Sequence, residues 1–261
     1  MPKLIFFDID GTLWDEKMQI PDSTRLAIRR LKENGHKTFL CSGRARGNIC
    51  SKELLGMGFD GIVAACGNHV EMDGAILYER ILDNDTVRRV IAVLEECHMP
   101  VVLEGTKHHW ISEQGFEEDP YVLYLFQDMG ESALPLRGFE EAIHINKFSA
   151  DILSHTDYAR VKAELGGEFE ILEHEKNVVE FVPKGTSKAT GIAWLCSYLG
   201  VEKEDTYAVG DSVNDLDMLK FVGHGIAMGN ASGEAKAVSE YVTEDIHEDG
   251  LYRAMQHYGL I

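Results

Sequence analysis

The sequence predicts an α/β protein whose core is a doubly wound parallel sheet and which carries an inserted α+β domain. Short apolar runs alternate with amphipathic helical runs near both ends of the chain. Acidic loops directly follow two of the apolar runs, and the pattern changes between residues 83 and 183. Such strand and helix alternation is typical of a parallel sheet covered by helices.

The first strands and helix are expected near the N-terminus. Residues 3–7 are an apolar run that ends in an acidic loop, which is typical of a buried strand. Residues 21–34 form an amphipathic pattern that starts with Asp, Ser and Thr capping candidates and ends at Gly35. A second strand follows over residues 37–41. The connection rule for strand–helix–strand units makes these two strands parallel neighbours in one sheet.

The same alternation returns late in the chain. Ligands of open parallel sheets bind at the carboxyl ends of the strands, where the loops meet. Asp8, Ser42 and Asp211 each follow an expected strand, so we expect these three side chains to lie at that edge. The later elements are expected over residues 187–199 (helix), 206–209 (strand), 215–221 (helix) and 225–228 (strand).

The middle of the chain has a different pattern, and we assign residues 83–183 to an inserted α+β domain. Residues 1–82 and 184–261 then form the core domain. The sequence shows no low-complexity linker and no internal repeat. The elements of the insertion are expected over residues 85–97 (helix) and 101–104, 108–112, 144–150 and 178–182 (strands).

The formal net charge of −19 limits the partners of the chain. It repels polyanions at long range, so we expect binding neither to nucleic acid nor to an anionic membrane. A site for a phosphorylated small molecule must overcome this field locally, which a divalent cation and a few basic side chains would do. The chain has no basic-then-apolar leader and no apolar run of about 18 residues, so a cytoplasmic location is expected.

The segment Asp8-Ile9-Asp10-Gly11-Thr12 carries two carboxylates at the expected edge of the sheet. Two neighbouring acids can divide their roles, because one can act as a nucleophile while the other, with a raised pKa, protonates a leaving group. The glycine lets the backbone approach a ligand closely. The alternative interpretation is an ordinary turn after a strand, in which Asp and Gly are common.

A second acidic loop, Gly210-Asp211-Ser212-Val213-Asn214-Asp215, also follows an apolar run and precedes a helix. Mg²⁺ prefers carboxylate and carbonyl oxygens and keeps several waters, so acids from two loops that meet at one edge predict a magnesium site. Taken alone, this loop could be only a helix cap. The presence of the first acidic loop makes that interpretation less attractive.

Two further segments could hold a phosphate group. In Ser42-Gly43-Arg44, the hydroxyl and the adjacent backbone N–H groups could bind phosphoryl oxygens at a helix start, a role compatible with that of an N-cap serine. Lys188 lies in the first turn of an expected helix, where the helix dipole disfavours a cation. A function would explain this position, and a solvated surface lysine is the alternative.

In this order, the four segments resemble the haloacid dehalogenase superfamily, and specifically its Cof-like phosphatases with a type IIB α+β cap. The resemblance covers most of the chain and implies a Rossmann-like core with a cap inserted after the second motif. The matching segments are residues 8–13 and 210–219, with support from residues 43–44, 180–183, 188 and 227–231.

The resemblance implies a role for each site residue. Asp8 would attack phosphorus and form an aspartyl phosphate, and Asp10 would protonate the leaving alcohol and then activate water. Mg²⁺ would be held by Asp8, by the backbone carbonyl of Asp10 and by Asp211. Asp215 would be either a further ligand or an acid that supports the ligands. Ser42 and Lys188 would act in catalysis by holding the transferring group. The positions implied for substrate binding are Gly11, Thr12, Ser42, Gly43, Arg44, Lys188 and Asn214.

The implied activity is magnesium-dependent hydrolysis of a small phosphorylated metabolite, such as a sugar phosphate, a nucleotide or a phosphorylated cofactor. Two other classes stay open: a catalytically idle protein that binds phosphate ligands on this fold, and a receiver-like domain that accepts phosphate on aspartate. The length of 261 residues, the insertion and Asp10 argue against a receiver. The sequence leaves open whether the protein is a monomer or a homodimer.

One segment departs from the family pattern. After the third strand the family often has Asn-Gly-Ala, whereas this chain has Asn68-His69-Val70. Histidine adopts positive φ angles less readily than glycine. We therefore expect the turn to have an altered geometry at His69.

Overall fold

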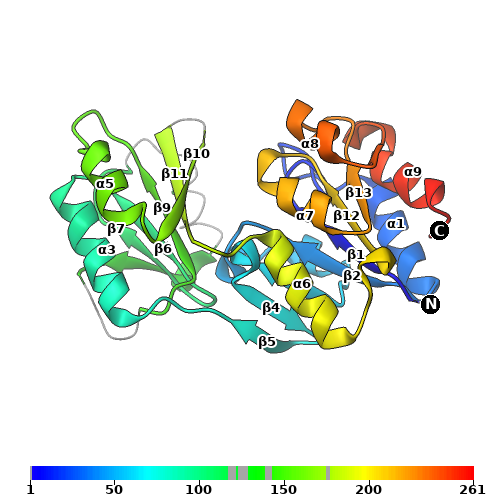
Figure 1. Ribbon diagram of the computed structural model, residues 1–261, viewed down its shortest axis with the longest axis horizontal. Coiled ribbons are helices and arrows are strands. Elements are labelled where there is room, and N and C mark those ends of the chain that lie inside the picture. The colour runs from blue at the N-terminus through cyan, green and yellow to red at the C-terminus, as the bar shows by residue number, and fades with distance from the viewer. Residues whose placement is uncertain (1, 117–121, 123–128, 139–142, 175–176) are drawn as a thin grey trace. The chain divides into compact units, whose positions relative to one another are not determined.

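The computed structural model describes residues 2–116, 122, 129–138, 143–174 and 177–261, which form two compact units (Figure 1). The first unit comprises Met1–Gly43, Lys52–Tyr78 and Ser187–Ile261, and the second comprises Arg44–Ser51 and Glu79–Thr186. Arg44–Ser51 therefore groups with the second unit, although the sequence places it in the core domain. The functional division into a core and a cap stays a prediction.

A sheet whose central strands are parallel forms the middle of the first unit (Figure 1). The strand β1 (Leu4–Phe7) is fully buried and runs parallel to both of its neighbours. The strands from β14 to β3 are parallel, and β4 pairs with β3 in the antiparallel direction. The strand order is β14 (Tyr241–Val242), β13 (His224–Ala227), β12 (Thr206–Gly210), β1, β2 (Lys37–Cys41), β3 (Gly61–Ala64), β4 (His69–Met72) and β5 (Ala75–Glu79).

The helices of the first unit form two groups. The helix α1 buries Thr24, Ala27, Ile28 and Leu31, whose spacing of three or four residues places them on one face. It contacts α9, whereas in the second group α7 contacts both α6 and α8. Together with the parallel strands of the sheet, these helices confirm the predicted α/β fold. Among the described residues, no helix combines the length and the apolar character that crossing a membrane requires. The helices described in the first unit have the bounds α1 (Asp22–Glu33), α2 (Lys52–Leu55), α6 (Lys188–Leu199), α7 (Leu216–Phe221), α8 (Gly233–Val238) and α9 (Gly250–His257).

The described part of the second unit is a mainly antiparallel sheet packed against the helices α3 and α5, as expected for an α+β domain. Its core includes Val90 and Leu94 of α3 (Asn84–Glu96), which pack against the sheet together with α5 (Tyr158–Leu165). Of the pairings described, the one between β7 and β8 is parallel. The strand order is β10 (Phe169–Glu173), β11 (Val178–Pro183), β9 (Lys147–Asp151), β6 (Val101–Glu104), β7 (His109–Ser112) and β8 (Ala133–Leu136).

The strand expected over residues 144–150 begins later, at Lys147. The carbonyl of Ile145 accepts the backbone N–H of Leu82 at 2.9 Å. The backbone N–H of Asn146 donates to the carbonyl of Glu104 in β6 at 2.9 Å, so residue 146 adjoins the ladder and the regular strand starts one residue later. The apolar residues of this stretch are buried nonetheless, which is why the sequence pattern resembles a strand.

The expectation of an altered turn at His69 is wrong, since His69 begins the regular strand β4. The left-handed conformations fall earlier, at Ala65, Cys66 and Gly67, with φ angles of 51°, 52° and 85°. A Cβ atom added at Gly67 would lie 2.2 Å from the carbonyl oxygen of Ser187, at the start of α6. The turn therefore requires glycine at position 67 and makes no such demand at position 69.

A buried lysine joins two acids in the sheet of the second unit. The Nζ atom of Lys147 lies 3.3 Å from Oε2 of Glu104 and also pairs with Oε1 of Glu180. Burial alone would raise the pKa of the Glu180 carboxyl, but the Lys147 charge and a hydrogen bond with His174 lower it to about 2. One ammonium group thus compensates two carboxylates that are removed from water.

We expect Lys147→Ala to lower the free energy of unfolding of the second unit by about 3–5 kcal/mol, because two buried carboxylates lose their counter-charge. Urea unfolding followed by circular dichroism measures this loss. Lys162→Ala removes an exposed lysine from the same unit and should change the free energy by less than about 1 kcal/mol. Equal effects of the two substitutions would show that the buried group does not stabilise the unit.

Candidate functional site

The central strand of the first sheet delivers Asp8 to the edge where the loops meet. The backbone N–H of Asp8 donates to the carbonyl of Val209 at 3.0 Å, so the ladder between β1 and β12 extends to this residue. Only 4% of the Asp8 surface is exposed. The buried apolar strand therefore fixes this carboxylate in position before any ligand is bound.

A tight turn follows Asp8 and positions Asp10. Trp14 lies beside Asp10 and donates its indole N–H to Oδ1 of Asp10 at 2.9 Å. The backbone N–H of Gly11 also donates to the carbonyl of Trp14. Asp10 is exposed, unlike Asp8, so the two carboxylates of this loop have different surroundings. Sequence analysis assigned no role to Trp14. Its position four residues after Asp10 was the only sequence feature that could have indicated a contact within the turn.

Gly11 brings the two acidic loops into contact. Its φ angle is +77°, and a Cβ atom at this position would lie 2.4 Å from Oδ2 of Asp211. The neighbouring Thr12 donates its hydroxyl to Oδ1 of Asp211 at 3.1 Å. Only glycine allows both the left-handed turn and this close approach, so the first loop supports Asp211 directly.

Lys188 links the nucleophile candidate to the second acidic loop. Its Nζ atom donates to Oδ1 of Asp8 at 2.5 Å, to Oδ1 of Asp215 at 2.6 Å and to Oδ1 of Asn214 at 3.0 Å. The lysine is the first residue of α6 and is almost fully buried, so it is not the solvated surface lysine of the alternative interpretation. Its three acceptors use all three of its N–H donors.

Asp215 uses its two oxygens for different tasks. Oδ1 accepts the hydrogen bond from Lys188, whereas Oδ2 accepts the backbone N–H groups of Asp211 and Ser212 at 2.9 and 3.0 Å. Ser212 in turn donates its hydroxyl to Oδ1 of Asn214. The helix-cap interpretation of this loop is therefore correct for Asp215 and Ser212, and the cap also orients Lys188 and Asn214.

The acids at this edge outnumber the cations. Asp8, Asp211 and Asp215 place carboxylate oxygens within 4.8 Å of one another. Burial and the Asp215 charge raise the pKa of Asp211 to about 7 and raise the pKa of Asp8. Burial would lower the pKa of Lys188, but the charges of Asp215 and Asp8 raise it. Three carboxylates around one ammonium leave a formal surplus of two negative charges, which suits a divalent cation with hard oxygen ligands.

Ser42 lies at the end of the neighbouring strand β2. Its backbone N–H donates to the carbonyl of Val63 at 2.9 Å, and its carbonyl accepts the N–H of Cys66 at 3.3 Å. The neighbouring Cys41, the last residue of β2, is fully buried, and burial raises the pKa of its thiol. Gly43 ends this part of the first unit, and Arg44 belongs to the second unit.

Asn230 is a further residue whose role the sequence analysis did not assign. Its amide N–H donates to the carbonyl of Gly11 at 2.8 Å, and its Oδ1 accepts the backbone N–H of Ile246 at 3.1 Å. It thereby connects the turn after Asp8 with a segment near the end of the chain. The matching residues 227–231 indicated that this region was important but gave no partner for the asparagine.

The arrangement of Asp8, Lys188, Asp211 and Asp215 can be compared with known proteins. The sequence profile of the haloacid dehalogenase-like hydrolases matches residues 5–255, nearly the whole chain. The chain belongs to this family. The predicted superfamily is therefore confirmed. The prediction of a hydrolase of the phosphatase class is confirmed as well, since relatives in this family are named phosphatases.

Individual relatives agree with this membership. YkrA of Bacillus subtilis (strain 168) is 32% identical over 99% of this chain and 98% of its own length. A second protein of the same organism, the 5-amino-6-(5-phospho-D-ribitylamino)uracil phosphatase YitU, is 28% identical over 98% of this chain and 97% of its own. Among solved structures, the HAD subclass IIB sugar phosphatase BT4131 is 26% identical, with a TM-score of 0.80 and coverage of 99% of this chain and 100% of its own.

We expect Gly11→Ala to lower kcat for an aryl phosphate by about 100-fold or more, because the new methyl group would displace the Asp211 carboxylate. Gly35→Ala is the matched control, since Gly35 has a φ angle of +81° and no atom within 4 Å of the added Cβ. Both substitutions strain the backbone by about 1–2 kcal/mol. Steady-state kinetics on the two folded variants checks the difference, and similar kcat values would contradict the proposed contact.

Proposed function

We propose that this hydrolase is a magnesium-dependent phosphatase that acts on small phosphorylated metabolites through an aspartyl phosphate on Asp8. The hydrogen bonding of the Asp8 carboxylate is the observation that supports this proposal most directly. Its Oδ1 is held by Lys188 at 2.5 Å, whereas Oδ2 makes no hydrogen bond within the described part of the chain. A buried carboxylate that is held by one oxygen presents the other to phosphorus, and such positioning supplies much of the catalysis in phosphoryl transfer.

In the first step, Oδ2 of Asp8 forms a bond to phosphorus while the bond from phosphorus to the leaving oxygen breaks. Asp10 gives its proton to that oxygen, so the product alcohol leaves neutral. In the second step, Asp10 takes a proton from a water molecule as the water oxygen attacks phosphorus. The bond between Asp8 and phosphorus then breaks, which releases phosphate and restores both carboxyl groups. The indole N–H of Trp14 orients Asp10 for both transfers.

The transferring phosphoryl group would be held by charges and dipoles that are fixed in advance. Lys188 lies within hydrogen-bond distance of Asp8 and would neutralise a phosphoryl oxygen. The hydroxyl group of Ser42, the amide N–H of Asn214 and the backbone at Gly43 are proposed to complete the phosphate-binding set. Gly11 and Thr12, also predicted to bind substrate, are engaged with Trp14 and Asp211, so we propose that they support the set by fixing the turn. Arg44 is also proposed as a substrate-binding residue, whose guanidinium group would meet a second anionic group.

The acidic cluster fits Mg²⁺, because its donors are hard carboxylate oxygens with a surplus of negative charge. Asp8, Asp211 and the carbonyl of Asp10 are proposed as direct ligands. Asp215 has both oxygens engaged in hydrogen bonds, so we propose that it supports the site by fixing the loop and Lys188. When bound, the cation would neutralise charge on the phosphoryl oxygens and lower the pKa of Asp8 and Asp211.

We propose phosphorylated sugars or sugar-derived alcohols as the first substrates to test. One relative is a 5-amino-6-(5-phospho-D-ribitylamino)uracil phosphatase, and a structural neighbour is a sugar phosphatase. Nucleotides and phosphorylated cofactors are further members of the same class. The inserted domain is proposed to act as a cap that selects among them and excludes water during the reaction.

Asp8→Asn is expected to lower kcat by at least about 10³-fold, because an amide cannot form the acyl phosphate. Removing Mg²⁺ with a chelator should abolish turnover by the wild type, and added Mg²⁺ should restore it. Hydrolysis of an aryl phosphate and of a panel of phosphorylated metabolites measures both effects. A folded, magnesium-loaded wild type that binds phosphate without hydrolysing any panel member would instead support the idle binding protein.

Asp10→Asn is expected to slow hydrolysis of an alkyl phosphate by about 10²–10⁴-fold. Its effect on an aryl phosphate should be smaller, because a phenolate leaves without full protonation. Trp14→Phe removes the N–H that orients Asp10 and should show the same preference with smaller losses. Steady-state kinetics on a matched pair of alkyl and aryl substrates checks this. Equal losses on both would contradict the role of Asp10 as the general acid.

A further inference from the structure

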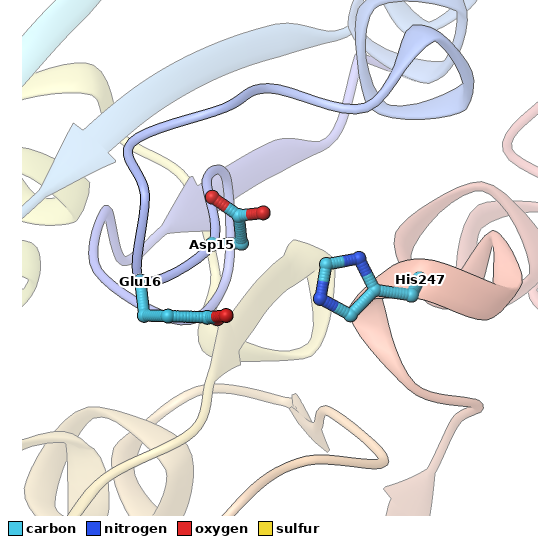
Figure 2. Close-up of side chains that lie close together, drawn as sticks. All are labelled: Asp15, Glu16 and His247. Atoms are coloured by element: carbon cyan, nitrogen blue, oxygen red, sulfur yellow. The ribbon is translucent and has the colours of Figure 1, made fainter.

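A second group of metal-ligating side chains lies in the first unit, apart from the acidic cluster around Asp8. Asp15 and Glu16 follow the turn after β1, and His247 lies in the 3₁₀ turn Ile246–Glu248. In Figure 2 the Glu16 carboxylate and the His247 imidazole extend toward each other, and the Asp15 carboxylate lies beside them. One ligand atom from each residue lies within 4.8 Å of the other two. Nothing in the proposed phosphatase reaction uses these residues.

Asp15 is the fixed member of this group. Only 8% of its surface is exposed, although it lies in a loop. Its Oδ1 accepts the backbone N–H groups of Lys17 and Gln19, each at 2.9 Å. Its Oδ2 makes no hydrogen bond or ion pair within the described residues. Asp15 thus exposes less than a tenth of its surface and has one carboxylate oxygen that makes no hydrogen bond or ion pair within the described residues.

The three side chains lie close together without bonding to one another. In the described ranges of the chain, the ring nitrogens of His247 make no ion pair within 4.0 Å of either carboxylate. Glu16 and His247 are exposed, so small rotations of their side chains can shorten the distances between ligand atoms. Ligands bonded to one cation at about 2.0–2.2 Å lie about 3 Å apart, which such rotations can reach.

We propose that Asp15, Glu16 and His247 form a binding site for a divalent transition-metal cation such as Zn²⁺. A set of one imidazole and two carboxylates differs from the all-oxygen cluster at Asp8, and imidazole favours Zn²⁺ and related metals over Mg²⁺ and Ca²⁺. The histidine also separates this group from the many exposed acidic patches that a chain of net charge −19 contains. Binding at this site is independent of the proposed reaction.

A cation at this site would join two segments that already meet at the active-site turn. Asn230 bonds to both the carbonyl of Gly11 and the backbone N–H of Ile246, the residue before His247. Trp14, the residue before Asp15, donates to Asp10. The metal would therefore cross-link the turn that carries Asp10 to the segment near the end of the chain, and it would stabilise that turn.

The test compares Zn²⁺ binding by the wild type and by His247→Ala. Both proteins are stripped of metal, saturated with excess Mg²⁺ and dialysed against Zn²⁺, and the retained zinc is measured by elemental analysis. The wild type is expected to retain about one equivalent more than His247→Ala. The same difference should appear in an Asp211→Asn background, in which the acidic cluster at Asp8 is weakened.

His155→Ala is the matched control, because it removes an exposed histidine from the second unit. It should retain as much zinc as the wild type, and Zn²⁺ should raise the melting temperature of both but not of His247→Ala. Glu16→Gln should weaken zinc binding without unfolding the chain, since Glu16 is exposed. Equal zinc retention by the wild type and His247→Ala, or an equal loss in His155→Ala, overturns the proposal.

Discussion

The ion pair of Lys188 with Asp8 and Asp215 is the interaction on which the rest of the site depends. The ammonium group is buried between two buried carboxylates, and α6 places it where the helix dipole disfavours a cation. Two charge-assisted hydrogen bonds offset that cost. Removal of the lysine would leave the carboxylates of Asp8 and Asp215 buried without compensation, so the fold and the proposed chemistry rely on the same contact.

Hydrogen bonds of Asp215 both fix the second acidic loop and hold Lys188. Asp215 holds Lys188 with one oxygen and caps its own turn with the other. The turn then presents Asp211 to Gly11 and Thr12 of the first loop. These contacts gather three carboxylates around the one ammonium group of Lys188, and burial together with the charge of Asp215 raises the pKa values of Asp8 and Asp211. The negative charge of this cluster would therefore favour the binding of a cation.

The sequence could predict the parallel core and most of the acidic cluster, because both follow from local patterns. Apolar runs define the strands, and a residue that directly follows a strand of a parallel sheet lies at its carboxyl edge. The hydrogen bonds of Trp14 and Asn230 could not be predicted in this way, since each depends on how loops fold back in space. The altered turn expected at His69 was wrong for the same reason, since the residue that needs the left-handed conformation is Gly67, whose close contact is with Ser187, far along the chain.

The motif Ser42-Gly43-Arg44 shows that neighbours in sequence need not share one structural role. Ser42 is bonded to β3 of the first sheet, whereas the segment that begins at Arg44 groups with the second unit. Gly47 of that segment donates its N–H to the carbonyl of Gly105, and a Cβ atom at Gly47 would approach that oxygen to 2.8 Å. The backbone at the serine is therefore held by the sheet of the first unit, whereas the segment that begins at the arginine is held by the second unit, so one short motif spans the boundary between the two units along the chain.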